Sequence, residues 1–280
     1  MIEKHLYGVN NFSGVSILGL KGSVYDIKTL YDADLQVFEE DSAINETSIN
    51  LINLGKVADI NSRVFNYADQ LIKDSKLPIC FGGDHSIAIG TISATAANYE
   101  NLGVIWVDAH ADINTEETSP TGNIHGMPLS FLLGHGREEL AMIGEFAPKI
   151  SASNIVYLGL RSVDSGEMLS ISNLGIRAYY FEEIEERGLD VVLAETLDYL
   201  HDCENIHLSF DFDSMDPQVF SAVSTPVQKG FNQEEVMNIF DTLKSTNKVK
   251  AIDLVEYNRT KDQEGQSFDF ALSLIKYLMD

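Results

Sequence analysis

Basic side chains are scarce in this sequence. Its 280 residues include 19 Lys and Arg against 43 Asp and Glu, which gives a formal net charge of −24 at pH 7. Nucleic acid backbones and anionic membrane surfaces would repel a chain of this charge, and no Lys/Arg cluster interrupts the acidic composition. We therefore expect neither nucleic acid nor a membrane as a partner.

Cysteine, proline and long apolar runs are scarce as well. Two cysteines, Cys80 and Cys203, are too few for a disulfide framework, so we expect buried free thiols in a reducing compartment. No secretory signal is visible, and no apolar run approaches the roughly 18 residues that span a membrane. The six prolines mark no domain boundary. These absences favour a cytoplasmic protein with a single domain over residues 1–280.

What the chain does contain is an alternation of strand-like and helix-like segments, with an apolar fraction of 44% that argues against disorder. Short apolar runs rich in β-branched residues predict strands at Val15–Leu20, Leu77–Phe81, Gly103–Val107, Asn154–Leu160, Ile176–Phe181, Ile206–Phe210 and Val249–Val255. Helical patterns lie at Ile44–Lys73, Ser86–Asn98, Leu189–His201, Gln233–Lys244 and Phe268–Met279. This alternation predicts an α/β fold, a three-layer αβα domain with a mainly parallel central sheet.

Capping residues and one weak segment refine this pattern. Asn232 followed by Glu235 predicts a capping box, and Ser267 is a candidate N-cap for the last helix. The stretch from Gly22 to Ser42 shows no clear period and is expected to be loop with a short helix.

Polar side chains follow four of the predicted strands. The segments concerned are Gly82–Ser86, Asp108–Asp112, Asp211–Asp216 and Glu256. In an open parallel sheet, ligands bind beyond the carboxyl ends of the strands. The sequence therefore predicts that carboxylates and imidazoles meet at one edge of the sheet.

Six of these side chains form a candidate metal site, namely His85, Asp108, His110, Asp112, Asp211 and Asp213. Four carboxylates brought together without cations would repel one another, whereas two His and four Asp suit divalent ions, and six ligands favour two ions over one. A lone Asp after a strand usually caps the next helix, and this alternative stays open for Asp84 and Asp216.

From about Leu77 to the C-terminus, the motifs GGDHS, DAHAD and SFDFDSMDP together resemble the ureohydrolase family, which includes arginase and agmatinase. The loop Asp112–Pro128 and the segment Leu160–Glu167 resemble arginase in particular. The resemblance implies contacts of Asn114, Ser119 and Thr121 with a substrate carboxylate, although Ser119 and Thr121 could be ordinary turn residues. The resemblance also implies that Asn123 supports this loop, that Asp164 and Glu167 bind the α-amino group of the substrate, and that Thr225 occupies a matching arginase position. For catalysis, it implies that Glu256 orients the guanidinium group, that Asp112 passes a proton to the departing amine, and that His125 shuttles protons between the site and solvent.

The same resemblance implies two Mn²⁺ ions per subunit, with other divalent transition metals as alternatives. One ion would be held by His85, Asp108, Asp112 and Asp211, and the other by His110, Asp108, Asp211 and Asp213. The implied reaction is hydrolysis of L-arginine to L-ornithine and urea by a metal-bridging hydroxide. Agmatine or another guanidino compound is an alternative substrate, and a non-catalytic arginine- or metal-binding relative is a further alternative. We expect a homo-oligomer on fold analogy alone.

Overall fold

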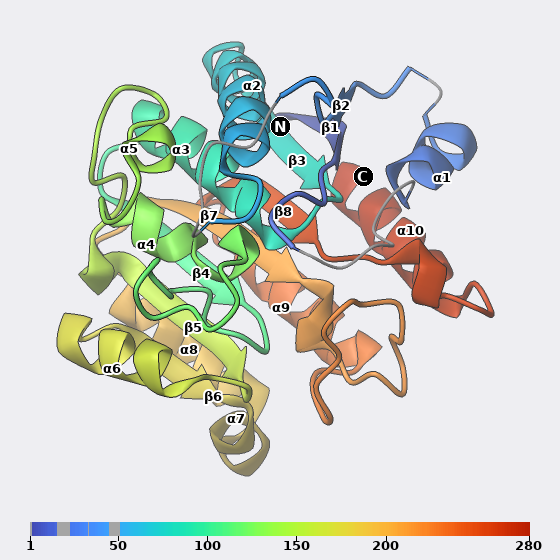
Figure 1. Ribbon diagram of the computed structural model, residues 1–280. Coiled ribbons are helices and arrows are strands. Elements are labelled where there is room, and N and C mark those ends of the chain that lie inside the picture. Colours follow the sequence, from blue (N-terminus) through green and yellow to red (C-terminus); the bar gives the residue numbers. More distant parts are fainter. Residues whose placement is uncertain (1, 16–22, 33, 45–50) are drawn as a thin grey trace.

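A computed structural model describes residues 2–15, 23–32, 34–44 and 51–280 (Figure 1). These residues form one eight-stranded sheet in the order β2-β1-β3-β8-β7-β4-β5-β6, and every pairing in it is parallel. The strands are β1 (Glu3–Asn10), β2 (Val37–Glu39), β3 (Lys76–Phe81), β4 (Leu102–Val107), β5 (Ile155–Leu160), β6 (Arg177–Tyr180), β7 (Asn205–Asp211) and β8 (Val249–Val255). The predicted α/β fold with a parallel central sheet is confirmed.

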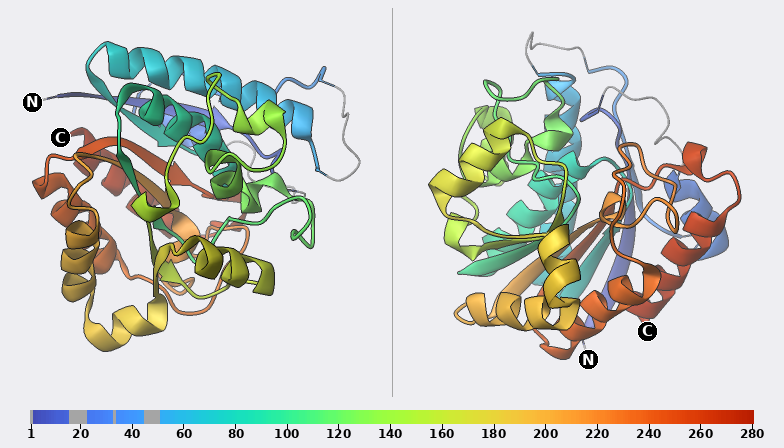
Figure 2. Two further views of the ribbon diagram at one scale, coloured as in Figure 1. Left: turned by 90° about the vertical axis from the view of Figure 1, so that its left-hand side faces the viewer. Right: turned by 90° about the horizontal axis from the view of Figure 1, so that it is seen from below.

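Helices cover both faces of this sheet (Figure 2). One layer contains α2 (Leu54–Lys73), α3 (Ala88–Asn98), α4 (Pro128–Leu132), α5 (Glu138–Ala141) and α6 (Ser165–Leu174). The other contains α1 (Ser23–Leu30), α7 (Phe181–Arg187), α8 (Leu189–Tyr199), α9 (Gln233–Ser245) and α10 (Gln266–Met279). Among the residues that the structure describes, no helix is long and apolar enough to span a membrane.

Strand β4 shows why the predicted strands are almost uniformly apolar. Val104 and Trp106 pack into the core on one face, whereas Ile105 and Val107 pack into the core on the other. Successive side chains of a strand point to opposite faces, so a strand covered on both faces needs apolar residues at every position.

Several sequence-based boundaries need correction. The predicted strand Val15–Leu20 lies, apart from Val15, outside the described residues, as do positions 45–50 of the predicted helix that corresponds to α2. Strand β1 was not predicted, because its first three residues are polar and do not belong to the continuous apolar run that marks a buried strand. Phe181 begins helix α7 and does not end a strand.

The two capping predictions had different outcomes. The Asn232–Glu235 capping box of α9 is confirmed. The N-cap predicted at Ser267 is wrong: Gly265, in a left-handed conformation, precedes α10, and Ser267 lies in its first turn.

The sheet order explains how distant motifs meet. Strands β3, β8, β7 and β4 are consecutive neighbours at the centre of the sheet, although they are far apart in the chain. They are the four strands whose carboxyl ends carry the polar motifs, so parallel pairing brings those motifs to one edge. All the described strands belong to this one sheet, and a single domain over residues 1–280 stays a prediction.

Candidate metal centre and substrate cavity

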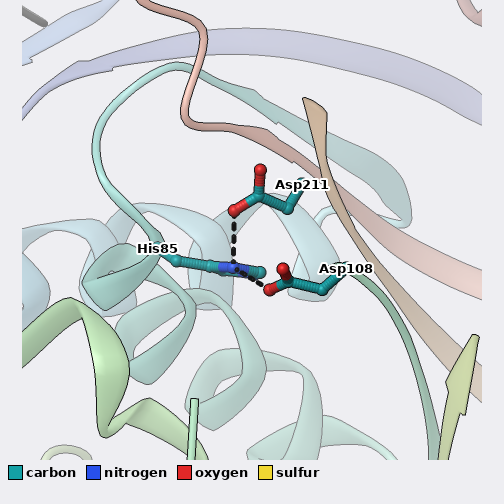
Figure 3. Close-up of side chains that lie close together, drawn as sticks. All are labelled: His85, Asp108 and Asp211. Atoms are coloured by element: carbon teal, nitrogen blue, oxygen red, sulfur yellow. Dashed lines mark ion pairs between the residues drawn. The ribbon is translucent and has the colours of Figure 1, made fainter. Parts of the chain in front are cut away.

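The deepest part of the site is a cluster around His85 at the carboxyl ends of β3, β4 and β7. Figure 3 shows the carboxylates of Asp108 and Asp211 pointing at the His85 ring. The Nδ1 atom of His85 lies 3.0 Å from Asp108 Oδ2, 3.1 Å from Asp112 Oδ2 and 3.2 Å from Asp211 Oδ2. We call these four residues the inner half-site. All four are buried.

The His85 ring is held from two sides. It stacks on the indole of Trp106, with ring centroids 3.9 Å apart and planes 10° from parallel. Its Nε2 atom lies 2.9 Å from Ser209 Oγ, which in turn lies 3.2 Å from Asp253 Oδ2. Because the serine hydroxyl donates its proton to Asp253, its oxygen accepts one from His85 Nε2–H. Nδ1 therefore faces the three carboxylates. Burial lowers the pKa of His85, but these carboxylates outweigh it and raise that pKa, so that Nδ1 carries a proton in the metal-free fold and offers its lone pair when a metal ion replaces that proton.

A second cluster shares Asp108. His110 Nδ1 lies 3.0 Å from Asp213 Oδ2 and 3.6 Å from Asp108 Oδ1. We call His110, Asp108 and Asp213 the outer half-site, because the His110 side chain is 25% exposed whereas His85 is 1% exposed. The indole N–H of Trp106 donates to Asp108 Oδ2 at 2.9 Å and fixes the carboxylate that both half-sites use.

The carboxylates of the two half-sites cannot all be ionised without compensation. Burial raises the pKa of Asp211 well above its ordinary value, and the charges of Asp213 and Asp108 raise it further. Burial and Asp108 likewise raise the pKa of Asp112 to about 6. Burial alone would raise the pKa of Asp108 too, but His110 and His85 outweigh it and lower that pKa. Two divalent cations would remove this repulsion.

The donor set fits divalent metal ions on a geometric observation as well. His85 Nδ1 is buried and has no hydrogen-bond partner among the described residues, although three carboxylate oxygens surround it. Two groups of side chains have ligand atoms close enough to hold an ion, His85–Asp108–Asp211 and Asp108–His110–Asp213. Imidazole nitrogen with carboxylate oxygen suits hard to borderline divalent ions, and Asp108 belongs to both groups.

A cavity of about 150 Å³ opens onto this cluster. Its walls include four predicted metal ligands or proton carriers, His110, Asp112, His125 and Asp211. All seven predicted substrate contacts also line it, namely Asn114, Ser119, Thr121, Asn123, Asp164, Glu167 and Thr225. The structure therefore brings together residues that lie more than 100 positions apart in the chain.

Ser119 and Thr121 combine the two roles that the sequence left open. Ser119 Oγ accepts the Gly122 N–H at 3.0 Å, and Thr121 Oγ1 accepts the Asn123 N–H at 3.2 Å. Both hydroxyls thus stabilise the turn as acceptors. Their protons remain available to donate to a ligand in the cavity, because a hydroxyl can accept and donate at once. Asn123 Oδ1, also in this wall, is buried without a partner in the part of the chain described.

Asp164 and Glu167 form an unpredicted capping box at the start of α6. Asp164 Oδ1 accepts the N–H groups of Gly166 and Glu167, and Glu167 Oε2 accepts the Asp164 N–H. Asn114 Nδ2 donates to Asp164 Oδ2 at 2.8 Å. Burial, followed by the charge of Asp112, raises the pKa of Glu167 to about 7. Two carboxylates are thereby fixed at a cavity wall, where a cationic ligand would meet them.

Glu256 lies next to His125 and is not among the residues that line the cavity. Its Oε1 accepts the backbone N–H of His85 at 3.0 Å and lies 3.1 Å from His125 Nδ1. Burial lowers the pKa of His125, but the hydrogen bond to Glu256 outweighs it and raises the pKa to about 9. The ring is therefore protonated near neutral pH. Glu256 Oε2 is buried without a hydrogen-bond partner among the described residues.

The remaining aspartates of the motifs behave as caps. Asp84 Oδ1 accepts the Ser86 N–H at 3.0 Å, and Asp216 Oδ1 accepts the Gln218 N–H at 2.8 Å. The capping alternative thus describes both residues. Thr225, which lines the cavity, donates its hydroxyl proton to Asp213 Oδ2 at 2.9 Å.

Sequence reasoning missed Trp106, Ser209 and Arg161, which hold the candidate ligands without being ligands. A signal existed for two of them. Trp106 is the only tryptophan of the chain and stands two residues before Asp108, and Ser209 stands two residues before Asp211. In a strand, residues two apart share a face, so both point toward the same side as the ligand that follows. Arg161 gave no comparable signal.

Comparisons with known proteins agree with this geometry. The model of the arginase family matches residues 17–280. An arginase of Bacillus subtilis (strain 168) is 42% identical over 229 residues, which cover 82% of this chain and 77% of that one. An arginase of Bacillus caldovelox is 38% identical over 252 residues, 90% of this chain and 84% of that one.

Solved structures give the same result at the level of the fold. The crystal structure of arginase from Bacillus subtilis superposes with a TM-score of 0.87 at 37% identity, over 99% of this chain and 98% of that one. Entamoeba histolytica arginase in complex with L-ornithine superposes with a TM-score of 0.88 at 28% identity, over 100% of this chain and 99% of that one. With the family model, these relatives and the geometry of the cluster in agreement, the chain belongs to the arginase family.

Proposed function

We propose that this chain is an arginase, which hydrolyses L-arginine to L-ornithine and urea. The observation that carries the proposal is one cavity, which is lined by His110, Asp112 and Asp211 of the ligand cluster and also by the carboxylates of Asp164 and Glu167. A substrate with a cationic group at each end, and a carboxylate beside one of them, matches such a cavity. The family membership of the chain, and the L-ornithine bound to its Entamoeba histolytica relative, support the same substrate.

Substrate binding follows from the cavity wall. Asp164 and Glu167 bind the α-ammonium group of arginine through charge-assisted hydrogen bonds. The hydroxyls of Ser119 and Thr121 donate to the α-carboxylate, next to Asn114 and Asn123. These contacts fix one end of the substrate, so its guanidinium extends toward the cluster and reacts from a defined position.

The residues around the cluster handle the guanidinium and the protons. Glu256 Oε2, which is free of protein partners in the described residues, accepts from a guanidinium N–H and orients it. Two divalent ions, held by the inner and outer half-sites, would acidify water so that it attacks the guanidinium carbon near neutral pH. Asp112 accepts the proton of that water and passes it to the departing amine as the C–N bond breaks. His125 holds a further proton and exchanges it with solvent.

We further propose Mn²⁺ as the metal, because mixed imidazole and carboxylate ligands suit it. We also propose that the protein is cytoplasmic and homo-oligomeric. The first is supported by Cys80 and Cys203, which are buried free thiols. The second rests on analogy with related folds.

The test is urea release from L-arginine by the purified chain after metal removal and reloading with Mn²⁺, Co²⁺ or Ni²⁺. Agmatine, which lacks the α-carboxylate, is measured in parallel. We expect metal-dependent turnover with a clear preference for arginine. Ser119→Ala should raise KM for arginine by about tenfold, the value of one hydrogen bond to a charged group, and leave agmatine unaffected. No turnover at any metal loading, or a preference for agmatine, would contradict the proposal.

A further inference from the structure

Arg161, directly after β5, makes an unusual set of contacts. Within the part of the chain that the structure describes, its guanidinium donates only to backbone carbonyl oxygens, those of Asp213 (2.7 Å), Met215 (3.2 Å), Gly159 (3.2 Å), Val227 (3.3 Å) and Gln228 (3.3 Å). Its cationic carbon lies 5.6 Å from the centroid of the Phe181 ring. No carboxylate lies within ion-pair distance of Arg161 among the described residues. A planar fork of five N–H donors suits this arrangement, whereas a single ammonium does not.

Four of the five carbonyls that Arg161 binds belong to one loop, and the fifth, that of Gly159, is on β5. The loop runs from Asp213 to Gln228, and it carries both the Asp213 carboxylate of the outer half-site and Thr225 of the cavity wall. The contacts at its start and its end are about a dozen residues apart, so one side chain joins the two ends of the loop.

The backbone of Arg161 reaches the other loop of the outer half-site. Its N–H donates to Ala109 O at 3.0 Å, between Asp108 and His110. The Ala109 N–H in turn lies 3.3 Å from Asp213 Oδ1. One residue therefore connects the loop that supplies His110 with the loop that supplies Asp213. None of its hydrogen bonds in the described structure reaches His85 or Asp112 of the inner half-site.

Gly230 provides a second, independent observation. Its φ of +129° is unfavourable for other residues, and a Cβ atom there would lie 2.7 Å from Arg161 Nη2 and 2.5 Å from Ser214 O. The absence of a side chain at Gly230 is thus a condition for the guanidinium to reach its carbonyl partners.

We propose that Arg161 is a positioning residue that sets the geometry of the outer half-site, with Gly230 making room for it. This inference rests on the proposed metal-dependent function. In that proposed function, Arg161 contacts neither the substrate nor a metal ion. Its effect passes through the backbone of Asp213, whose carboxylate must face His110 and Asp108 at once. Loss of these hydrogen bonds to carbonyl oxygens should weaken binding of the ion at the outer half-site and leave binding at the inner half-site unchanged.

The test is a titration of the metal-free full chain with Mn²⁺, followed by calorimetry and by metal analysis after gel filtration. The variants are Arg161→Lys, which keeps the charge but has one nitrogen, and Gly230→Ala, which crowds the guanidinium. Arg187→Lys is the matched control, because Arg187 pairs with Glu183 and Glu195 on α7 and α8, away from the site. We expect both test variants to lose about 10- to 100-fold in affinity for one of two ions, as removal of residues that orient ligands typically does.

A second readout is amide hydrogen exchange of the metal-free proteins. Residues 212–230 should exchange faster in Arg161→Lys and Gly230→Ala than in the wild type, with the central strands unchanged. Unchanged affinity for both ions would overturn the inference, and so would parallel loss of both ions, since that indicates a general structural role. A wild-type chain that binds two ions without releasing urea would refute the proposed function, yet the titration would still decide the role of Arg161.

Discussion

The inner and outer half-sites use the same residue types but hold their histidines differently. His85 is stacked on Trp106 and hydrogen-bonded to Ser209, deep in the sheet edge. His110 is partly exposed to the cavity, and within the described residues the ion pairs of its ring are those with Asp108 and Asp213. The inner histidine is therefore fixed by core residues, whereas the ring of the outer histidine is held through the carboxylates of Asp108 and Asp213.

Because of this difference, we expect substitutions in the two half-sites to have different effects. A ligand held by packing and by a directed hydrogen bond keeps its geometry before a cation arrives. A ligand on a loop depends on contacts that hold the loop backbone, and Arg161, which follows β5, provides such a contact at Asp213. The comparison predicts that the inner half-site controls the stability of the metal-free protein, whereas the outer half-site controls how fully both metal sites are occupied and therefore turnover.

The largest expected effect comes from removing the residue that both half-sites share. Asp108→Ala should lose both ions and reduce turnover by about a thousandfold or more, equivalent to about 4 kcal/mol of transition-state stabilisation. Metal analysis and urea release measure the two losses. Asp216→Asn is the matched control, since it alters a carboxylate of a neighbouring motif that caps a turn and should keep both ions. Retained activity in Asp108→Ala would contradict the shared role.

A smaller effect separates the half-sites directly. His85→Ala leaves buried carboxylates without their partner, so it should lower the free energy of unfolding of the metal-free protein by about 3 to 5 kcal/mol. His110→Ala removes a partly exposed partner and should cost about 1 kcal/mol or less. Urea denaturation of the two metal-free variants measures this. Equal destabilisation would remove the distinction between an inner and an outer half-site.

The smallest effect is a pH dependence of the stabilisation that metal provides. In the metal-free fold, burial and Asp108 raise the pKa of Asp112 to about 6, and burial and Asp112 raise that of Glu167 to about 7. A raised carboxylate pKa means that the folded state favours the protonated form. The metal-free protein should therefore lose stability as the pH rises from about 4 to about 7.

Divalent ions neutralise this charge, so the loaded protein should not show the same loss. The difference in Tm between loaded and metal-free protein should grow across this pH range. Glu167→Gln, which removes a raised carboxylate outside both half-sites, should reduce the slope of the metal-free protein and keep metal binding. A Tm difference that is constant with pH would show that the carboxylate repulsion is not relieved by metal.

Much of the site could be predicted because its residues follow strands directly. Asp108, His110 and Asp211 lie at or just beyond strand ends, and buried strands are recognisable by their continuous apolar runs. Strand β1 was missed because only its second half is fully buried. The capping box of Asp164 and Glu167 was missed because the segment was interpreted only through its resemblance to arginases.

The sequence by itself determined the alternation of strands and helices, the acidic cluster at the strand ends and the family of the chain. These properties depend on local pattern and on short motifs. Only the tertiary structure decided that β3, β8, β7 and β4 are neighbours, that Ser209 orients His85, and that Arg161 joins two loops. The physical reason is that such contacts join residues far apart in the chain: local spacing can show which face of a strand a side chain lies on, but its partner depends on sheet order and packing.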